Sequence, residues 1–300
     1  MLDCPHKMQE FTSFDGDRFS YRSFGTTDEA STIIIGVHGI SGASYDYIGL
    51  GEYLEKHHPG CALYAYEVRG QGLDPNQSRI GDIHRPQEWY QDLYAFTRLV
   101  RDLHPKARII WCGESMGSLI TLHAYAARLD KPSLCDGLIL LAPVVKIGNQ
   151  IPSWKLNLAR LVSWMFPRFR VKLDQLHDDE TVKVTQGSDS HSAQSSTNEW
   201  HIESYTLRLL SILGAHIRGM MQQAKHITHP VLILNGGQDY FTPAAFTEEF
   251  VSHIPSSTDT RHRYFPDAYH LLMYDDARNE VFAAISQWIG DKYGQADQIS

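Results

Sequence analysis

Short apolar runs alternate with amphipathic segments along most of this chain, and the alternation predicts β-strands separated by α-helices. In the clearest helix, Pro86–Leu103, one face carries the apolar side chains of Trp89, Leu93, Phe96 and Val100. Residues Phe11–Gly25 alternate around Asp15-Gly16, which predicts a β-hairpin. The other predicted strands are Ser31–Gly36, Cys61–Val68, Ala107–Cys112, Asp136–Leu141, Pro230–Leu234 and Arg261–Phe265. Strands joined through helices indicate an α/β fold with a mostly parallel sheet and right-handed crossovers.

This alternation stops near Lys146 and resumes at Pro230. The intervening segment contains two helical patterns and a polar loop, at Ser153–Phe169, Tyr205–Ala224 and Gln186–Asn198. We therefore expect a core domain formed by residues 1–145 and 227–300. Residues 146–226 are expected to form a helical cap, inserted between two strands of the sheet.

The composition is typical of a soluble globular protein. Of the 300 residues, 42% are hydrophobic and 21% are charged, which suffices for one large core. The formal net charge of −8 disfavours nucleic acid as a partner. The N-terminal segment lacks the apolar stretch of a secretory signal, and no apolar run reaches the roughly 18 residues of a membrane span. We therefore expect a cytoplasmic protein.

The four cysteines lie at positions 4, 61, 112 and 135. They form no C-x-x-C pair and show no Cys/His spacing typical of a zinc site. The last three fall in or beside predicted buried strands, where free thiols are common. The cysteines therefore favour free thiols over disulfides, and we expect no metal site.

The segment Gly113-Glu114-Ser115-Met116-Gly117 joins the apolar run Ala107–Cys112 to the helical pattern Ser118–Ala127. A G-x-S-x-G turn between a strand and a helix is the nucleophile-elbow pattern, in which the serine Oγ projects above the sheet. Small residues at both ends allow the strand and the helix to approach closely. The motif alone also occurs as an incidental Gly-Ser turn, so its position between strand and helix is what makes Ser115 the candidate nucleophile.

A serine nucleophile requires a base, and the base requires a group that fixes its tautomer. When the nucleophile lies in such an elbow, the acid and the histidine follow it in that order along the chain. Asp239 lies in the loop after the strand Pro230–Leu234, which is where open α/β sheets place active-site groups. His270 lies in the loop after the last predicted strand. We therefore expect Asp239 to be the acid and His270 the base.

Other interpretations of these loops stay open. An aspartate at position 239 also suits a turn or a helix N-cap, because a helix is predicted soon afterwards. Three rival acids follow the wrong strand and lie close to His270 in sequence: Asp267, Asp275 and Asp276. Two other histidines, His253 and His262, fall in a predicted helix and a predicted strand, which are poorer positions for a base.

An oxyanion hole needs two backbone donors near the nucleophile. The amide of Met116 is one candidate, since it follows Ser115 directly. We nominate the amide of Ile40 as the second, because the segment Val37-His38-Gly39-Ile40 ends an early strand. His38 and Gly39 would then lie beside the substrate, although the interpretation we prefer for His38 is a structural histidine that supports the loop by hydrogen bonds.

Taken together, these motifs resemble those of the α/β-hydrolase superfamily. Within it they look like the monoacylglycerol lipase / lysophospholipase group, which includes serine-aminopeptidase-like members. The resemblance covers most of the chain and rests on Phe14-Asp15-Gly16, His38-Gly39-Ile40, Arg69-Gly70-Gln71-Gly72, Gly113–Gly117, Leu141-Ala142-Pro143, Pro230–Asp239 and Ala268-Tyr269-His270. It implies an eight-stranded sheet, a helical cap after the sixth strand and ester hydrolysis without a cofactor. By the same match, Ser115 is the nucleophile, Asp239 the acid and His270 the base.

The chain departs from the family pattern at three places. Glu114 stands where elbows of this group commonly carry histidine. The oxyanion loop reads Gly39-Ile40-Ser41-Gly42 in place of H-G-x-G-E, and the cap is the least recognisable part. Glu114 either adds negative charge beside the nucleophile or points away and pairs with an arginine, and the sequence leaves both interpretations open.

The predicted cap is rich in apolar side chains, among them Trp154, Trp164 and Phe166. They suit an acyl-chain tunnel or a peripheral contact with a lipid surface. Packing of the cap on the core accounts for them equally well, and a dimer face is a third interpretation. The expected substrate is a carboxylic ester of the monoacylglycerol or lysophospholipid type.

The same three catalytic groups serve other reactions. A small-ester carboxylesterase, a serine aminopeptidase, an acyltransferase and a C–C bond hydrolase all remain alternatives. An aminopeptidase needs carboxylates that hold a free amine, for which Glu203 and Asp178-Asp179-Glu180 are candidates. A binding module without catalysis is disfavoured, because all three catalytic side chains are present in order.

Overall fold

The computed structural model describes residues 8–25, 30–146, 161–172, 183–185 and 200–294. An eight-stranded sheet in the order β1-β2-β4-β3-β5-β6-β9-β10 forms its centre. The strands are β1 (Gln9–Thr12), β2 (Arg18–Phe24), β3 (Thr32–Val37), β4 (Cys61–Tyr66), β5 (Arg108–Glu114), β6 (Gly137–Leu141), β9 (Val231–Gly236) and β10 (Thr260–Phe265). Among the described residues of this sheet, the β1–β2 and β2–β4 pairs are antiparallel and the other pairs are parallel. The predicted mostly parallel sheet is therefore confirmed.

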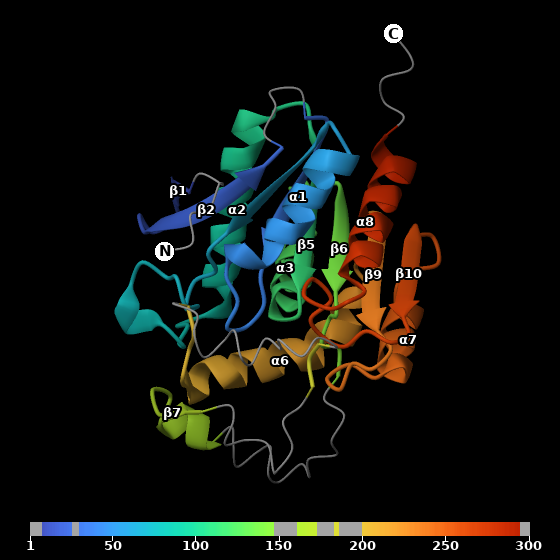
Figure 1. Cartoon of the computed structure of the whole chain (residues 1–300). Helices are drawn as coiled ribbons and strands as arrows, with labels where there is room; N and C mark the ends of the chain where they lie inside the picture. The colour runs from blue at the N-terminus through green and yellow to red at the C-terminus, as the bar shows by residue number, and fades with distance from the viewer. Residues whose placement is uncertain (1–7, 26–29, 147–160, 173–182, 186–199, 295–300) are drawn as a thin grey trace.

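Helices cover both faces of this sheet (Figure 1). The longer helices are α1 (Ile48–His57), α2 (Pro86–Leu103), α3 (Met116–Ala126), α6 (Leu207–Ala224), α7 (Ala244–Ser252) and α8 (Arg278–Tyr293). Two short 3-10 helices are η1 (Ser44–Tyr47) and η2 (Gln77–Arg79). A separate two-stranded sheet pairs β7 (Arg170–Val171) with β8 (Tyr205–Thr206). In Figure 1, α6 crosses beyond the ends at which the central strands finish, so it lies on the side of the sheet where α/β folds place their sites.

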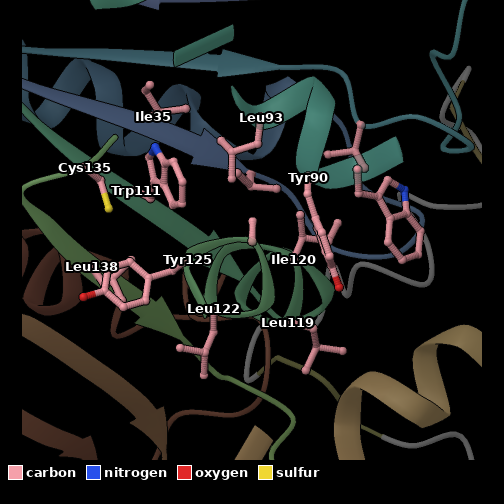
Figure 2. Close-up of a cluster of buried hydrophobic side chains, with 14 of the residues drawn as sticks. Ile35, Tyr90, Leu93, Trp111, Leu119, Ile120, Leu122, Tyr125, Cys135 and Leu138 are labelled. Atoms are coloured by element: carbon pink, nitrogen blue, oxygen red, sulfur yellow. The ribbon is translucent and has the colours of Figure 1, made fainter. Parts of the chain in front are cut away.

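Two apolar layers hold the helices on the sheet. One layer packs α2 and α3 against one face, and the other packs α1 and α8 against the opposite face. Figure 2 shows Trp111 of β5 and Leu93 of α2 on one side of α3, with Leu119 and Leu122 of α3 on its opposite side. Because α3 is enclosed by apolar side chains, the position of its first turn relative to the sheet is fixed.

The predicted N-terminal hairpin is confirmed by the antiparallel pairing of β1 with β2. Gly16 has a φ of +92°, a conformation that favours glycine. The neighbouring Asp15 accepts a hydrogen bond of 2.7 Å from Arg69, and Arg69 also binds Asp92 of α2 at 2.7 Å. Arg69, from one of the family motifs, thus joins the hairpin to α2.

The segment predicted as the cap contains both helix and strand. Residues 161–165 are helical, as predicted, while the earlier part of that predicted helix lies outside the described residues. The helix predicted from Tyr205 begins at Leu207, because Tyr205 and Thr206 pair with β7 as a strand. The Thr206 side chain then caps α6 by accepting the Leu209 N–H at 3.1 Å.

Cys61, Cys112 and Cys135 are buried and have free thiols, as the sequence predicts. The described residues include no group of three His, Cys, Asp or Glu side chains suited to a metal ion. Over the same residues, no helix combines the length and the apolar character that crossing a bilayer requires.

Candidate active site

The strand–turn–helix context predicted for Ser115 is present. β5 ends at Glu114 and α3 begins at Met116, which leaves Ser115 alone in the turn, with φ +51° and ψ −114°. Non-glycine residues rarely adopt such a conformation, and it persists only where the surroundings impose it. A Cβ on Gly117 would lie 1.8 Å from the Val37 carbonyl oxygen. The turn is therefore tight enough to require glycine beside the serine.

The structure brings Ser115, His270 and Asp239 together in a hydrogen-bonded chain. Ser115 Oγ lies 2.8 Å from His270 Nε2, and His270 Nδ1 lies 2.8 Å from Asp239 Oδ2. The second oxygen of Asp239 accepts the backbone N–H groups of Phe241 at 2.8 Å and Thr242 at 3.2 Å. A carboxylate held at Nδ1 assigns the ring proton to that nitrogen, so Nε2 can accept the serine proton.

Loops at the same edge of the sheet carry these residues. Asp239 follows β9 and His270 follows β10, and these two strands are parallel neighbours. A Cβ on Gly236 would lie 2.2 Å from the Tyr269 carbonyl oxygen, so the two loops are in direct backbone contact. The Phe241 ring packs edge-on against His270 at 4.9 Å between centroids. Close packing of the two loops keeps the imidazole in one orientation.

The rival residues take other positions. Asp275 is buried and accepts the backbone N–H of Tyr269 at 3.1 Å, which shapes the loop around His270. Asp267 and Asp276 are exposed. Two other histidines form separate contacts: His253 Nδ1 lies 2.8 Å from the Glu249 carbonyl oxygen, and the His262 ring packs on Tyr264.

The loop after β3 lies directly beside the elbow. A Cβ on Gly39 would lie 3.4 Å from the Ser115 Cβ, so Gly39 borders the serine, and Ile40 is the next residue in the chain. Ser41 has a φ of +56°. Its N–H donates to Gln71 Oε1 at 3.0 Å, and its hydroxyl forms a short hydrogen bond with the Tyr205 hydroxyl. Both partners hold a residue whose backbone conformation is otherwise unfavourable.

Sequence reasoning missed the roles of Gln71 and Tyr205. Gln71 belongs to the motif Arg69-Gly70-Gln71-Gly72, which was a usable signal because family motifs outside regular elements commonly have a positioning role. Tyr205 carried no such signal, since it lies 164 residues from Ser41 in a segment predicted as helix.

His38 is completely buried beneath this loop. Its Nε2 accepts the Val68 N–H at 2.9 Å, and its Nδ1 lies 3.0 Å from the Gly39 carbonyl oxygen. Burial lowers the pKa of His38 to about 4. The ring is therefore neutral near pH 7, has no surface available to a substrate in this structure, and supports the loop backbone.

Glu114 points into the interior with two other polar groups, Asp46 and Tyr274. The Met273 backbone N–H donates to its carboxyl group, while its Oε1 atom has no hydrogen-bond partner among the described residues. Burial and repulsion from Asp46 raise the pKa of Glu114 well above its usual value. Glu114 makes no ion pair with an arginine within the described part of the chain, so it favours the protonated state in the interior.

The predicted cap residues have different surroundings. The Trp164 and Phe166 residues are 79% and 55% exposed, so they lie on the surface, whereas Trp154 falls outside the described residues. Glu203 is exposed and lies 3.8 Å from Lys172, and the other acidic candidates, 178–180, are also outside the described residues. These contacts do not place Glu203 in a pocket for a free amine.

Residues 183–185, within the range predicted as the cap, contact the loop that carries His270. The Leu271 N–H donates to the Val184 carbonyl oxygen at 3.0 Å. The Lys183 ammonium lies 4.7 Å above the Tyr269 ring. Residues 183–185 therefore lie against the candidate site, a contact between segments remote in sequence.

The fold and the arrangement at the ends of β5, β9 and β10 define a hydrolase of the α/β-hydrolase fold. The sequence pattern of the serine aminopeptidase S33 family matches residues 28–277. Because this match spans most of the chain, the protein belongs to that family and is a serine hydrolase.

Individual relatives agree with this assignment. The chain is 21% identical over 290 residues to a monoacylglycerol lipase of Mycolicibacterium smegmatis, covering 96% of this chain and 99% of the relative. Its structure is similar to that of Paleococcus ferrophilus monoacylglycerol lipase, with a TM-score of 0.75, 20% identity and coverage of 91% and 98%. It is also similar to a carboxyl esterase of Bacillus coagulans, with a TM-score of 0.77, 18% identity and coverage of 96% and 99%. At these identities the structural matches establish the shared fold.

Proposed function

We propose that this protein hydrolyses carboxylic esters, with Ser115 as nucleophile, His270 as general base and acid, and Asp239 as the residue that orients the imidazole. The observation that carries the proposal is the pair of 2.8 Å contacts linking Ser115 Oγ to His270 and His270 to Asp239. Hydrogen-bond contact between nucleophile, base and orienting carboxylate is the arrangement that activates a serine hydroxyl.

In the proposed reaction, Ser115 Oγ attacks the ester carbonyl carbon while His270 Nε2 takes its proton. The carbonyl oxygen becomes an oxyanion, which the backbone amides of Ile40 and Met116 stabilise. Breaking the bond to the alcohol oxygen forms an acyl-enzyme, and His270 returns its proton to the departing alcohol. Water, deprotonated by His270, then attacks the acyl carbon, and His270 returns this proton to Ser115 Oγ as the acyl–serine bond breaks and the acid is released.

For the substrate we propose a monoacylglycerol or a lysophospholipid-like lipid. Lipases and an esterase among the relatives support an ester, and two of them are named for monoacylglycerol. We also propose that residues 1–145 and 227–300 form the catalytic core and that 146–226 form a cap. Exposed Trp164 and Phe166 in that range suit contact with a lipid surface, because apolar side chains lose unfavourable hydration there.

A series of monoacylglycerols from short to long acyl chains tests this proposal. We expect hydrolysis to increase toward long chains, and Ser115→Ala to lower kcat by about 10⁴–10⁶-fold. Ser252→Ala is the matched control, since that serine of α7 is exposed and its hydroxyl donates to the Glu249 carbonyl oxygen of the same helix, at 2.6 Å. A fluorophosphonate probe should add mass to the wild type and to the control but not to Ser115→Ala.

The alternatives give distinct results in the same experiment. Activity confined to short chains would replace the lipid with a small ester. Labelling at Ser115 without ester turnover would favour an aminopeptidase or a C–C bond hydrolase. Aminopeptide anilides and C–C bond substrates would then be the next compounds to assay. Near-normal turnover by Ser115→Ala would overturn the nucleophile assignment.

A further inference from the structure

A cavity of about 450 Å³ lies away from Ser115, His270 and Asp239 and is lined by none of them. Three segments line it and leave it open to solvent: the loop containing η2, the chain around β7, and the start of α6. Its charged walls are Arg79, Asp82, His84, Arg168, Arg170 and Arg208. Four guanidinium groups thus surround a cavity with one carboxylate, in a chain whose formal net charge is −8. This local concentration of positive charge favours an anion.

Two of the four arginines are compensated by carboxylates. Arg208 binds Asp82 at 2.5 Å, and Arg79 binds the buried Asp74 at 2.7 Å and Asp17 at 2.8 Å. These ion pairs fix the two side chains as part of the cavity wall. Because these carboxylates largely cancel their charges, Arg79 and Arg208 add little to the positive potential in the cavity. They contribute to its shape and offer N–H donors.

Arg170 is held by backbone carbonyl groups and not by carboxylates. Its guanidinium donates to the Ser204 carbonyl oxygen at 3.1 Å and to the Ile80 carbonyl oxygen at 2.7 Å. A Cβ on Gly81 would lie 2.9 Å from Arg170 Nη1, so the guanidinium also packs directly on the backbone. Carbonyl groups orient a guanidinium without cancelling its charge, which leaves Arg170 both ordered and cationic.

Arg168 supplies a second uncompensated charge. Its side chain is exposed at the cavity, and among the described residues no carboxylate lies within ion-pair distance of Arg168 or Arg170. The positive end of the α6 dipole adds to this field, because Thr206 at the cavity wall is the helix N-cap. The first amides of α6 donate to the Phe169 and Pro167 carbonyl oxygens, so the helix contributes its field and not its N–H groups.

We propose that this cavity binds a phosphate group, with Arg168 and Arg170 as the principal contacts. A planar guanidinium can donate two parallel N–H groups to two phosphate oxygens, which gives both charge and geometric selectivity. The cavity is larger than a phosphate group alone, so it also accommodates the group to which the phosphate is attached. The phosphate comes from a free phosphate ester or from a lipid headgroup, and the exposed Phe169 between the two arginines is the reason to test a lipid.

Binding to the whole protein tests this proposal at constant ionic strength, with sodium chloride replacing each probe. The soluble probes are inorganic phosphate and glycerol 3-phosphate, measured by isothermal titration. The lipid probes are vesicles of phosphatidylcholine with and without phosphatidylglycerol, measured by co-sedimentation. We expect Arg168→Gln to weaken binding about tenfold and Arg168→Glu to abolish it, since a single charged contact to phosphate contributes strongly to affinity.

Arg263→Gln is the matched control, because this partly exposed arginine lies on β10 at the opposite edge of the sheet from β1 and β2. It should bind every probe like the wild type, and thermal melting should show that all variants are folded. Binding of a soluble probe that Arg168→Gln weakens assigns a free phosphate ester. Arg168-dependent binding of anionic vesicles alone assigns a lipid headgroup. Absence of binding to all probes, or equal loss in Arg263→Gln and Arg168→Gln, would overturn the proposal.

Discussion

Glu114 places a carboxyl group in the interior one residue before the proposed nucleophile. Burial and the nearby Asp46 raise its pKa, so the folded chain retains a proton that the unfolded chain releases above its usual pKa. Above that value the unfolded state binds fewer protons, and the free energy of unfolding therefore falls as pH rises. We expect Glu114→Gln, which mimics the protonated side chain, to lose less thermal stability than the wild type between pH 5 and pH 9.

Other buried carboxyl groups also lower the free energy of unfolding as pH rises, both in the wild type and in Glu114→Gln. Burial raises the pKa of Asp46 to about 6 and that of Glu67 to about 7, so most of their effect is complete near pH 7. The difference between the wild type and Glu114→Gln should therefore be clearest above pH 7. Glu55→Gln, at an exposed position on α1, should follow the wild-type curve of Tm against pH. Parallel curves for all three proteins would show that Glu114 is ionised in the folded state.

At the scale of elements, the approach of α3 to β3 depends on Gly117. A Cβ there would lie 1.8 Å from the Val37 carbonyl oxygen, a backbone atom that can move only with its strand. We expect Gly117→Ala to lower the free energy of unfolding by about 3 kcal/mol or more, as other overpacked sites do. Urea unfolding measures this loss directly.

Gly290 of α8 gives the matched control. A Cβ there would lie 3.6 Å from His58 Cε1, which is ordinary contact, and alanine restricts the unfolded chain more than glycine. Gly290→Ala should therefore be neutral or stabilising by about 0.5–1 kcal/mol. Equal effects of the two substitutions would contradict the close contact between α3 and β3.

The loop of residues 39–42, which carries the proposed oxyanion donor Ile40, is held by a second element, β8. The Tyr205 hydroxyl bonds Ser41, which has a left-handed backbone and directly follows Ile40, the proposed oxyanion donor. We expect Tyr205→Phe to lower kcat for ester hydrolysis about tenfold with little change in KM, because a loosened amide affects the oxyanion more than the bound ester. Steady-state kinetics on one soluble ester separates the two constants.

Tyr264→Phe removes a hydroxyl of the same type from the other edge of the sheet, where it bonds the Ala244 carbonyl oxygen at 2.7 Å. This control should keep both kinetic constants. A tenfold rise in KM with unchanged kcat in Tyr205→Phe would show that Tyr205 contributes to substrate binding instead of to the position of the loop.

At the scale of the whole molecule, α6 belongs by sequence to the predicted cap but packs on the core. Leu209 and Met220 share an apolar cluster with α3. His216 bonds the Tyr90 hydroxyl at 2.5 Å, and His123 Nε2 lies 2.9 Å from the His216 carbonyl oxygen. These contacts join α6 to both α2 and α3, so the helix and the sheet should open together.

Amide hydrogen exchange measures this coupling. We expect central amides of α6 to exchange within about tenfold of those of α3, because both require the same cooperative opening. The short strand β7, which pairs with β8 in the two-stranded sheet, should exchange much faster and gives the contrast. Exchange of α6 at the rate of β7 would show that the cap opens independently of the core.

Local sequence patterns were sufficient to predict much of this fold. The alternation of apolar strands and amphipathic helices predicts the parallel sheet, since burial on both faces leaves continuous apolar runs in the sequence. The elbow around Ser115 and the loops of Asp239 and His270 were also predictable, because parallel strands finish at one edge and a loop's place in chain order identifies that edge. The roles of these three residues remain our proposal.

The sheet, the turn at Ser115 and the loops of Asp239 and His270 thus follow from local sequence patterns. Three features depend on contacts between remote segments: Tyr205 and Gln71 hold Ser41, Glu114 lies in the interior, and four arginines line one cavity. The physical reason is distance along the chain. Periodicity and turn chemistry act between neighbours, whereas these contacts form when packing brings remote segments together.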